Sequence, residues 1–496
     1  MRQLTGSDHL WFALETDHAP MHFVGAAVYD PSTRPGGAPG LADLRRVVEK
    51  ELPRLPLRTR LLNVPWRTDL PYWVDDADFD LAHHVRELTL RPPGDRGAFL
   101  HAITDLLEAP FDPSRPLWEM CLVRDLDGVG DFPPGCFAVM VRVHHGQFDG
   151  TTALRLRHSL HEERAEAAGG PPPAWAPERT PSAPELLLRA PWHAAGRTWR
   201  AAAAAGSMAP ALLRRAGRSA GRGTGRESGS RDGGGRDGGG RGRGPAGPRP
   251  AVPHTRFSSR LASDRRVFDF LHLPLDEVRE IRTAVDGATV NDVASTIAAG
   301  ALRRYLASVG ELPGEPLVVM MPVSAHDPGS EREAGNRISL MTATAHTEIA
   351  DPLERLRAGR AASARSKRAT TEVGAGRVAD LVDALPTNLL DLVAEPLLRS
   401  GIPDALPMPF SGVALTNVPG PPEPLHFDGA RMVTLLGATF LYDFVGLIIA
   451  ITSYCDQLLV AFTSTPEAVP DPGALADCFR EAYHELREAA EAGPRP

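Results

Sequence analysis

The chain has 496 residues, a length that suggests two domain-sized units rather than a single core. Hydrophobic residues make up 42% and charged residues 23%, so most of the chain can bury enough apolar surface to fold. Asp plus Glu number 62 against 54 Lys plus Arg, and the formal charge of −8 argues against a dedicated nucleic-acid binder. We therefore expect no nucleic-acid partner.

The cysteines and the N-terminal sequence indicate in which cellular compartment the protein is expected. The chain contains four cysteines: Cys121, Cys136, Cys455 and Cys478. None belongs to a C-x-x-C pair, so neither a disulfide framework nor a zinc ribbon is indicated, and a reduced, cytoplasmic compartment fits best. The N-terminus lacks the apolar region of a signal peptide. The most apolar stretch, 433–452, is interrupted by Tyr442 and Asp443 and is interpreted as two strands rather than a membrane span.

The first region, residues 1–165, alternates predicted strands and helices. Strands are predicted at Val24–Tyr29 and Phe137–Val143, and helices at Leu41–Leu52 and Ala98–Leu107. This alternation indicates an α/β or α+β fold.

The second region, residues 166–262, differs in composition. From Gly217 to Pro250 it has no aromatic residue and no aliphatic residue larger than Ala. Such a stretch cannot build a core, so we expect a long flexible linker that is disordered over 217–250. Its arginines could contact RNA, but no Phe or Tyr is interleaved for base stacking, and a plain linker is favoured.

The third region, residues 263–496, is predicted to be structured again. Thr289 can cap a helix in which Val290, Val293 and Ile297 follow helical spacing. Asp471 can cap a final helix, with Pro472 at its first position. Five strands are predicted between these helices: Leu317–Val323, Ser339–Ala345, Gly412–Thr416, Gly446–Tyr454 and Gln457–Thr463.

The segment from His144 to Gly150 carries the candidate chemistry. A nearly continuous apolar strand, of the kind buried on both faces, leads directly into His144 and His145. Asp149 and Gly150 follow, ahead of a predicted helix over Thr151–His161. A side chain at the end of such a strand is held at the mouth of a sheet, where open sheets place their sites. An imidazole there can act as a base near neutral pH.

Two adjacent histidines can also have a role other than catalysis. They can be packed or solvated, or they can bind a metal together with Asp149. Neighbouring residues on a strand point to opposite faces, so His144 and His145 cannot easily share one ion, and we expect no metal site. From the residue types alone, a catalytic role and a structural role both stay open.

The segment resembles the H-H-x-x-x-D-G motif of CoA-dependent acyltransferases related to chloramphenicol acetyltransferase, a group that includes the condensation domains of peptide synthetases. Further blocks narrow the resemblance to the bacterial wax ester synthase/diacylglycerol acyltransferase (WS/DGAT) family. They occur in order and cover nearly the whole chain apart from the linker. The blocks are Leu4–Asp8, Pro20–His22, Pro116–Glu119, Thr289–Val293, Met321–Ser324, Gly335–Arg337 and Thr416–Pro421.

This resemblance implies roles for individual residues. His145 would be the general base, and Asp149 would hold the loop rather than carry a proton. Asp292 has a second interpretation, because it can cap its own helix opposite Thr289. The remaining site residues would line the site: His144, Gly150, Asn291, Asp292, Ser324, Thr416 and Asn417.

The same resemblance bears on three short segments. Thr416 and Asn417 would position the second half against the first, or simply end a strand. The Pro116–Trp118 segment is expected to pack beside the entrance rather than take part in chemistry. Gly146 stands where the family often has Ala, and we expect this exchange of one small residue for another to be silent.

The resemblance implies two chloramphenicol-acetyltransferase-like halves with a central channel. Acyl-CoA would donate a long-chain acyl group to diacylglycerol, giving triacylglycerol, or to a long-chain alcohol, giving a wax ester. His145 would take the hydroxyl proton, and the oxyanion would be met by Asn291, Ser324 or backbone amides. No metal or other cofactor is required.

Two other function classes compete with this one. The first is a non-catalytic lipid-binding or membrane-associated protein of the same fold, which the intact His145 and Asp149 argue against. The second is a condensation-type enzyme that joins an acyl group to an amine, which the family-specific blocks argue against.

The expected substrates are lipids, so we expect peripheral contact with the inner membrane surface or a lipid droplet. Trp192 and Trp199 are seven residues apart and share one helical face, with Arg189, Arg197 and Arg200 to one side. Aromatic rings beside arginines suit an anionic interface. The alternative is that both tryptophans pack on the protein's own core.

Overall fold

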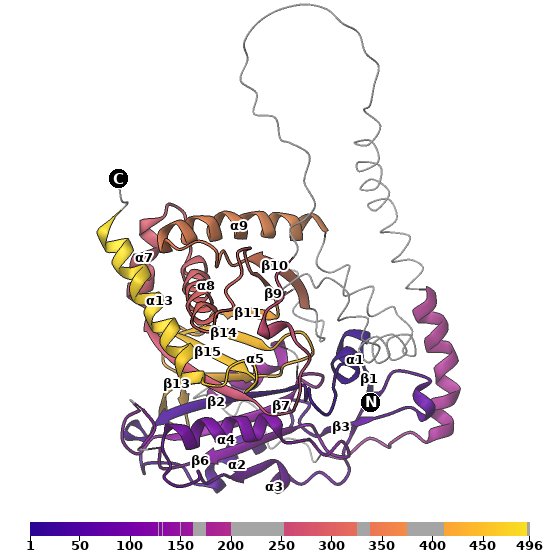
Figure 1. The fold of residues 1–496 in the computed structure, drawn as a ribbon. Coiled ribbons are helices and arrows are strands. Elements are labelled where there is room, and N and C mark those ends of the chain that lie inside the picture. Colours follow the sequence, from indigo (N-terminus) through magenta and orange to yellow (C-terminus); the bar gives the residue numbers. More distant parts are fainter. Residues whose placement is uncertain are drawn as a thin grey trace, which may run out of the picture.

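A computed structural model of the chain describes eight stretches of the sequence: 1–126, 128–130, 132–148, 150–161, 175–199, 252–324, 338–373 and 411–493. The fold mixes helices with two six-stranded sheets and one three-stranded sheet (Figure 1). The helices and strands predicted from the sequence are confirmed to within two residues at either end. No helix in these stretches is long and apolar enough to cross a membrane.

The first large sheet has the strand order β12-β13-β2-β7-β6-β5. Its central strands, β2 and β7, pair antiparallel and place His22 opposite His144. One face packs on α4 and the other on α2 and α5. The strands are β2 (His22–Asp30), β5 (Val85–Glu87), β6 (Trp118–Val123), β7 (Phe137–His144), β12 (His426–Phe427) and β13 (Ala430–Thr439). The helices around it are α1 (Gly6–Ala13), α2 (Leu41–Glu51), α3 (Leu81–His84), α4 (Arg96–Glu108) and α5 (Gly150–His161).

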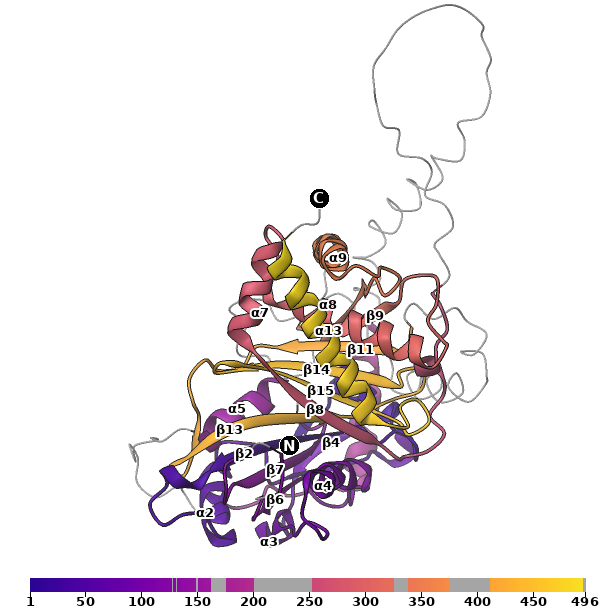
Figure 2. The same ribbon diagram turned by 60° about the vertical axis from the view of Figure 1, so that its left-hand side comes forward.

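The second large sheet has the strand order β10-β9-β11-β14-β15-β8. Figure 2 shows its helices on the side away from the first sheet. Thr289 and Asp471 cap α8 and α13 through their side chains, as predicted. The strands are β8 (Val267–Pro274), β9 (Val318–Ser324), β10 (Ile338–Thr344), β11 (Val413–Val418), β14 (Leu447–Tyr454) and β15 (Gln457–Ser464). The helices are α7 (Leu275–Ile281), α8 (Val290–Ser308), α9 (Pro352–Val373) and α13 (Pro472–Ala492).

A segment from the C-terminal part of the chain joins the first sheet. Strands β12 and β13 follow β11 in the sequence, yet β13 pairs with β2 of the first sheet, from Arg431 opposite Asp30 to Thr439 opposite Phe23. The sequence pattern assigns residues 263–496 to the second half, and that assignment does not predict that β13 joins the first sheet. The reason is physical: an apolar strand has the same sequence pattern whichever sheet it joins.

A smaller unit consists of the three-stranded sheet and a helix over 183–199. Its strands are β1 (Arg2–Gln3), β3 (Thr59–Leu62) and β4 (Tyr72–Asp75). The Asp69 side chain is fully buried and lies 2.6 Å from Arg197 Nη2 and 2.7 Å from His193 Nδ1. Part of the expected linker is therefore folded, whereas 217–250 lies outside the described residues.

The side chains of this helix differ from two of the expectations from the sequence. Trp192 and Trp199 are 80% and 77% exposed, so the alternative that they pack on the core is wrong. The core-facing side is already occupied by Leu186 and Ala190. Arg197, expected beside the tryptophans, is instead buried, because the carboxylate of Asp69 binds it from the inner side.

We expect Asp69→Ala to release this helix. The buried Arg197 guanidinium would lose its counter-charge, a change that costs about 3–5 kcal/mol. Limited trypsin digestion at Arg189, measured together with the melting temperature, reports the release. Asp78→Ala, which removes an exposed carboxylate, is the control. Equal cleavage rates for both variants would show that Asp69 does not anchor the helix.

Candidate active site

His145 follows the last residue of β7 and lies where the two large sheets approach each other. Its ring centroid is 4.1 Å from that of Trp11 and 5.2 Å from that of Phe440. Both aromatic residues pack in an apolar cluster that draws on the second sheet. The members from β9, β11 and β14 are Met320, Ala414 and Ile448. The imidazole thus contacts side chains from both ends of the chain.

His144 has different surroundings. Its ring stacks on Phe12 with centroids 4.3 Å apart and an interplanar angle of 10°. Its Nδ1 accepts a hydrogen bond from the Gly146 N–H at 3.0 Å, so the neutral ring carries its proton on Nε2. That Nε2 lies 3.4 Å from Glu15 Oε2. The separation of the two rings agrees with the alternation expected at a strand end.

Helix α1 supplies one aromatic partner for each histidine. A capping box between Thr5 and Asp8 begins this helix. Trp11 and Phe12 are consecutive on it, and they meet His145 and His144 respectively.

Gln147 fastens the motif loop, and no sequence pattern signals this role. Its buried side chain accepts from the Leu117 N–H at 2.7 Å and donates to the carbonyls of Pro56 and Thr59 at 3.2 and 3.1 Å. The His144 N–H in turn donates to the Leu117 carbonyl at 3.0 Å. The Pro116–Trp118 segment therefore braces the loop from the neighbouring strand.

The predicted residues of the second half lie at helix and strand ends. Asn417 Nδ2 donates to Asn291 Oδ1 at 2.7 Å. Asn417 follows Thr416 and is three residues beyond Ala414 on β11, so it lies about 10 Å along the strand from the cluster at His145. Asp292 Oδ2 accepts from the backbone N–H and the hydroxyl of Thr289 at 2.9 and 2.8 Å, which confirms its capping role.

Three predicted residues are described only in part or not at all. Asp149 lies outside the described residues. Gly150 is the first residue of α5, and Ser324 is the last residue of β9, where its backbone pairs with Ile338.

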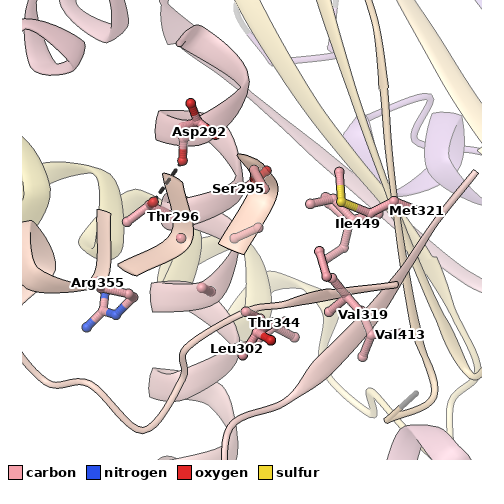
Figure 3. A pocket seen from close by; sticks show the side chains of 17 residues that line it. Asp292, Ser295, Thr296, Leu302, Val319, Met321, Thr344, Arg355, Val413 and Ile449 are labelled. Carbon is pink, nitrogen blue, oxygen red and sulfur yellow. Dashed lines mark hydrogen bonds between the residues drawn. The ribbon is translucent and has the colours of Figure 1, made fainter. Parts of the chain in front are cut away.

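A small pocket of about 30 Å³ lies between α8, α9 and the second sheet (Figure 3). Asp292 and Thr296 of α8 and Arg355 of α9 line one side. The sheet contributes Val319, Met321, Val413, Leu415 and Ile449. These alternate along their strands with the residues that face the His145 cluster, so the pocket lies on the opposite face of the sheet. The pocket is therefore separate from the candidate active site.

The expectation for Gly146 is wrong. A Cβ atom at this position would lie 2.3 Å from Phe12 Cε2 and 2.8 Å from Cζ, well inside van der Waals contact. The Phe12 ring cannot move freely, because it is stacked on His144 and its centroid lies 6.1 Å from that of Trp73. Glycine is therefore needed here for close approach.

Gly146→Ala should lower the free energy of unfolding by about 1–3 kcal/mol through overpacking. A smaller side chain at position 12 relieves the overlap, so Phe12→Leu should make the alanine substitution less costly. Thermal denaturation of the two single variants and the double variant measures this coupling. Gly314→Ala is the matched control, because its Cβ would meet nothing within 4 Å. Additive effects at positions 12 and 146 would contradict the prediction.

Two family profiles match the chain. The wax ester synthase/diacylglycerol acyltransferase catalytic domain matches residues 4–294, and the WS/DGAT C-terminal domain matches residues 334–487. A proposed diacylglycerol O-acyltransferase of Mycobacterium tuberculosis is 31% identical over 100% of this chain and 99% of its own. The O-acyltransferase WSD of Acinetobacter baylyi is 27% identical over 95% of this chain and 93% of its own.

Solved structures agree on the fold. The wax ester synthase/diacylglycerol acyltransferase of Marinobacter aquaeolei has a TM-score of 0.65 at 23% identity, covering 99% of this chain and 100% of that one. The starter condensation domain of rhizomide synthetase, solved with C8-CoA, has a TM-score of 0.53 at 15% identity, covering 100% and 96%. These likenesses confirm the expected fold class. With its two profiles covering both halves, the chain belongs to the wax ester synthase/diacylglycerol acyltransferase family of acyltransferases.

Proposed function

We propose that this protein transfers a long-chain acyl group from acyl-CoA to the hydroxyl group of diacylglycerol or of a long-chain alcohol, with His145 as the general base. The observation that carries the proposal is the position of the imidazole, at the junction of the two sheets and against Trp11 and Phe440. Apolar walls suit an acyl chain and keep water away from a thioester.

The reaction needs one proton shuttle and one oxyanion donor. His145 removes the hydroxyl proton as the oxygen attacks the thioester carbonyl, which forms the C–O bond. Collapse of the tetrahedral intermediate breaks the C–S bond, and the departing CoA sulfur takes the proton from His145. The resemblance makes Asn291 one candidate donor; its Oδ1 accepts from Asn417, which lies about 10 Å along β11 from the His145 cluster. Ser324 and backbone amides are the other candidates.

Diacylglycerol is the first choice of acceptor. The relatives from Mycobacterium tuberculosis carry that acceptor in their names, and they match this chain from end to end. The family description also includes wax ester synthesis, which uses a long-chain alcohol.

His145→Ala should lower the rate of CoA release from palmitoyl-CoA in the presence of diacylglycerol by about 10²–10⁴-fold, because the base is lost. His144→Ala should have a smaller effect. The assay runs across diacylglycerols, alcohols and amines, with circular dichroism to verify folding and the exposed His101→Ala as control. A well-folded His145→Ala protein that keeps most of its activity would rule out this mechanism. Preference for an amine acceptor would favour condensation chemistry instead.

We further propose that the enzyme meets its lipid substrates through the outer face of the 183–199 helix. Leu188, Trp192 and Trp199 are 75%, 80% and 77% exposed. At about 100° per residue they lie within about 40° of one another around the helix. Arg189 is exposed at the flank, whereas Arg197 is occupied by Asp69 and Arg200 lies outside the described residues. In the described part of this helix, the outer face thus offers an apolar stripe flanked by one exposed arginine.

Trp192→Ala/Trp199→Ala should reduce flotation with liposomes while leaving turnover of a short-chain, water-soluble acceptor unchanged. The reason is that both indoles face solvent. Thr198→Ala, an exposed residue of the same helix outside the stripe, is the control. Vesicles with and without anionic lipid separate the apolar from the electrostatic contribution. Equal flotation of the double variant and wild type would remove this face as the membrane contact.

A further inference from the structure

Glu15 lies between two buried histidines and has no role in the mechanism above. Its Oε2 is 3.4 Å from His144 Nε2, and its Oε1 is 3.5 Å from His22 Nε2. Oε1 also accepts from the Met21 N–H at 3.4 Å. The side chain is 35% exposed, against 2% for each histidine side chain. One carboxylate thus contacts both the end of β7 and the start of β2.

The hydrogen bonds of the cluster assign its protons. His144 Nδ1 accepts from Gly146, so His144 Nε2 carries the proton. This Nε2 lies 3.4 Å from Glu15 Oε2, within ion-pair distance but without hydrogen-bond geometry. His22 Nδ1 donates to the Leu107 carbonyl at 3.3 Å, so its Nε2 can donate to Glu15 only when the ring carries both protons.

The charges around Glu15 keep it ionised. Burial raises the pKa of Glu15, but hydrogen bonds and charge from His144 and His22 outweigh burial and hold the pKa well below its usual range. Burial lowers the pKa of His22, opposed by its hydrogen bond to Glu15 and reinforced by the charge of Arg142. His22 and His144 are the titratable groups that this carboxylate contacts in the described structure. A buried imidazole N–H beside an anion stabilises the conformation of the loop that carries it.

We propose that Glu15 is the positioning residue for His145, acting through His144 and Met21. The His145 N–H donates to the Met21 carbonyl at 2.9 Å, and the Met21 N–H donates to Glu15. The ring of His144, the residue before His145, lies 3.4 Å from the other oxygen of the same carboxylate. The carboxylate of Glu15 therefore contacts both neighbours of the His145 backbone, namely the ring of His144 and the N–H of Met21. This inference rests on the proposed function of His145 as the base.

Glu15→Gln tests the proposal with little change in shape. The amide NH₂ group must face either the Met21 N–H or an imidazole N–H, so one attachment is lost. We expect kcat to fall by about 10-fold or more, toward the ~10²-fold that a displacement of about 1 Å can cost. KM for acyl-CoA and for the acceptor should stay unchanged, because Glu15 does not touch substrate in this role. Glu315→Gln, at an exposed carboxylate, is the matched control.

A double variant distinguishes positioning from a general structural role. If Glu15 acts through His145, adding Glu15→Gln to His145→Ala should lower the residual rate by no more than about twofold. Additive losses, a raised KM for the acceptor, or wild-type kcat in Glu15→Gln would each overturn the proposal.

A second readout does not depend on activity. Nitrogen-15 NMR of the histidine rings should show the Nε2-protonated form of His144 in wild type and a changed signal in Glu15→Gln. A wild type without acyltransferase activity that still shows this change would refute the proposed function while leaving the Glu15 contact established. An active wild type with the other tautomer of His144 would refute the role of Glu15 alone.

Discussion

The antiparallel pairing of β2 with β7 is the constraint on which the candidate site depends. Its register sets His22 opposite His144 and brings the His145 N–H onto the Met21 carbonyl. A slip of one residue would turn every side chain of β2 to the other face of the sheet. Such a slip would also move His22 away from the position in which Glu15 contacts both rings. The local geometry of the motif is thus a property of two strands rather than of the motif alone.

The candidate site is also built from segments that lie far apart in the sequence. Strand β13 belongs to the C-terminal part of the sequence but pairs with β2, and the residue after its last, Phe440, packs against His145. The opposite wall comes from alternate residues of β9, β11 and β14. An apolar junction of this kind lowers the local dielectric, which strengthens the effect of each fixed charge or dipole on a reacting group. Neither half supplies this environment without the other.

The helix over 183–199 has a polar, anchored inner face and an apolar outer face. A fully buried carboxylate, Asp69, binds His193 and Arg197 on the inner side. With the helix held from within, large apolar side chains remain on the solvent side. An exposed apolar stripe on an anchored element is a feature of interaction surfaces rather than of ordinary monomer surfaces. The proposed lipid contact and the proposed chemistry would thus lie on different parts of one chain.

The sequence by itself determined the order of the helices and strands, the caps at Thr289 and Asp471, the motif around His145 and the family. These follow from local patterns, because capping, periodicity and motif spacing act over a few residues. Only the tertiary structure decided that β13 joins the first sheet, that Gly146 must be glycine beside Phe12, that Arg197 faces inward, and that Glu15 contacts both buried histidines. Each of these depends on residues far apart in the sequence, and contacts of that kind are decided by the packing of whole elements rather than by any local pattern.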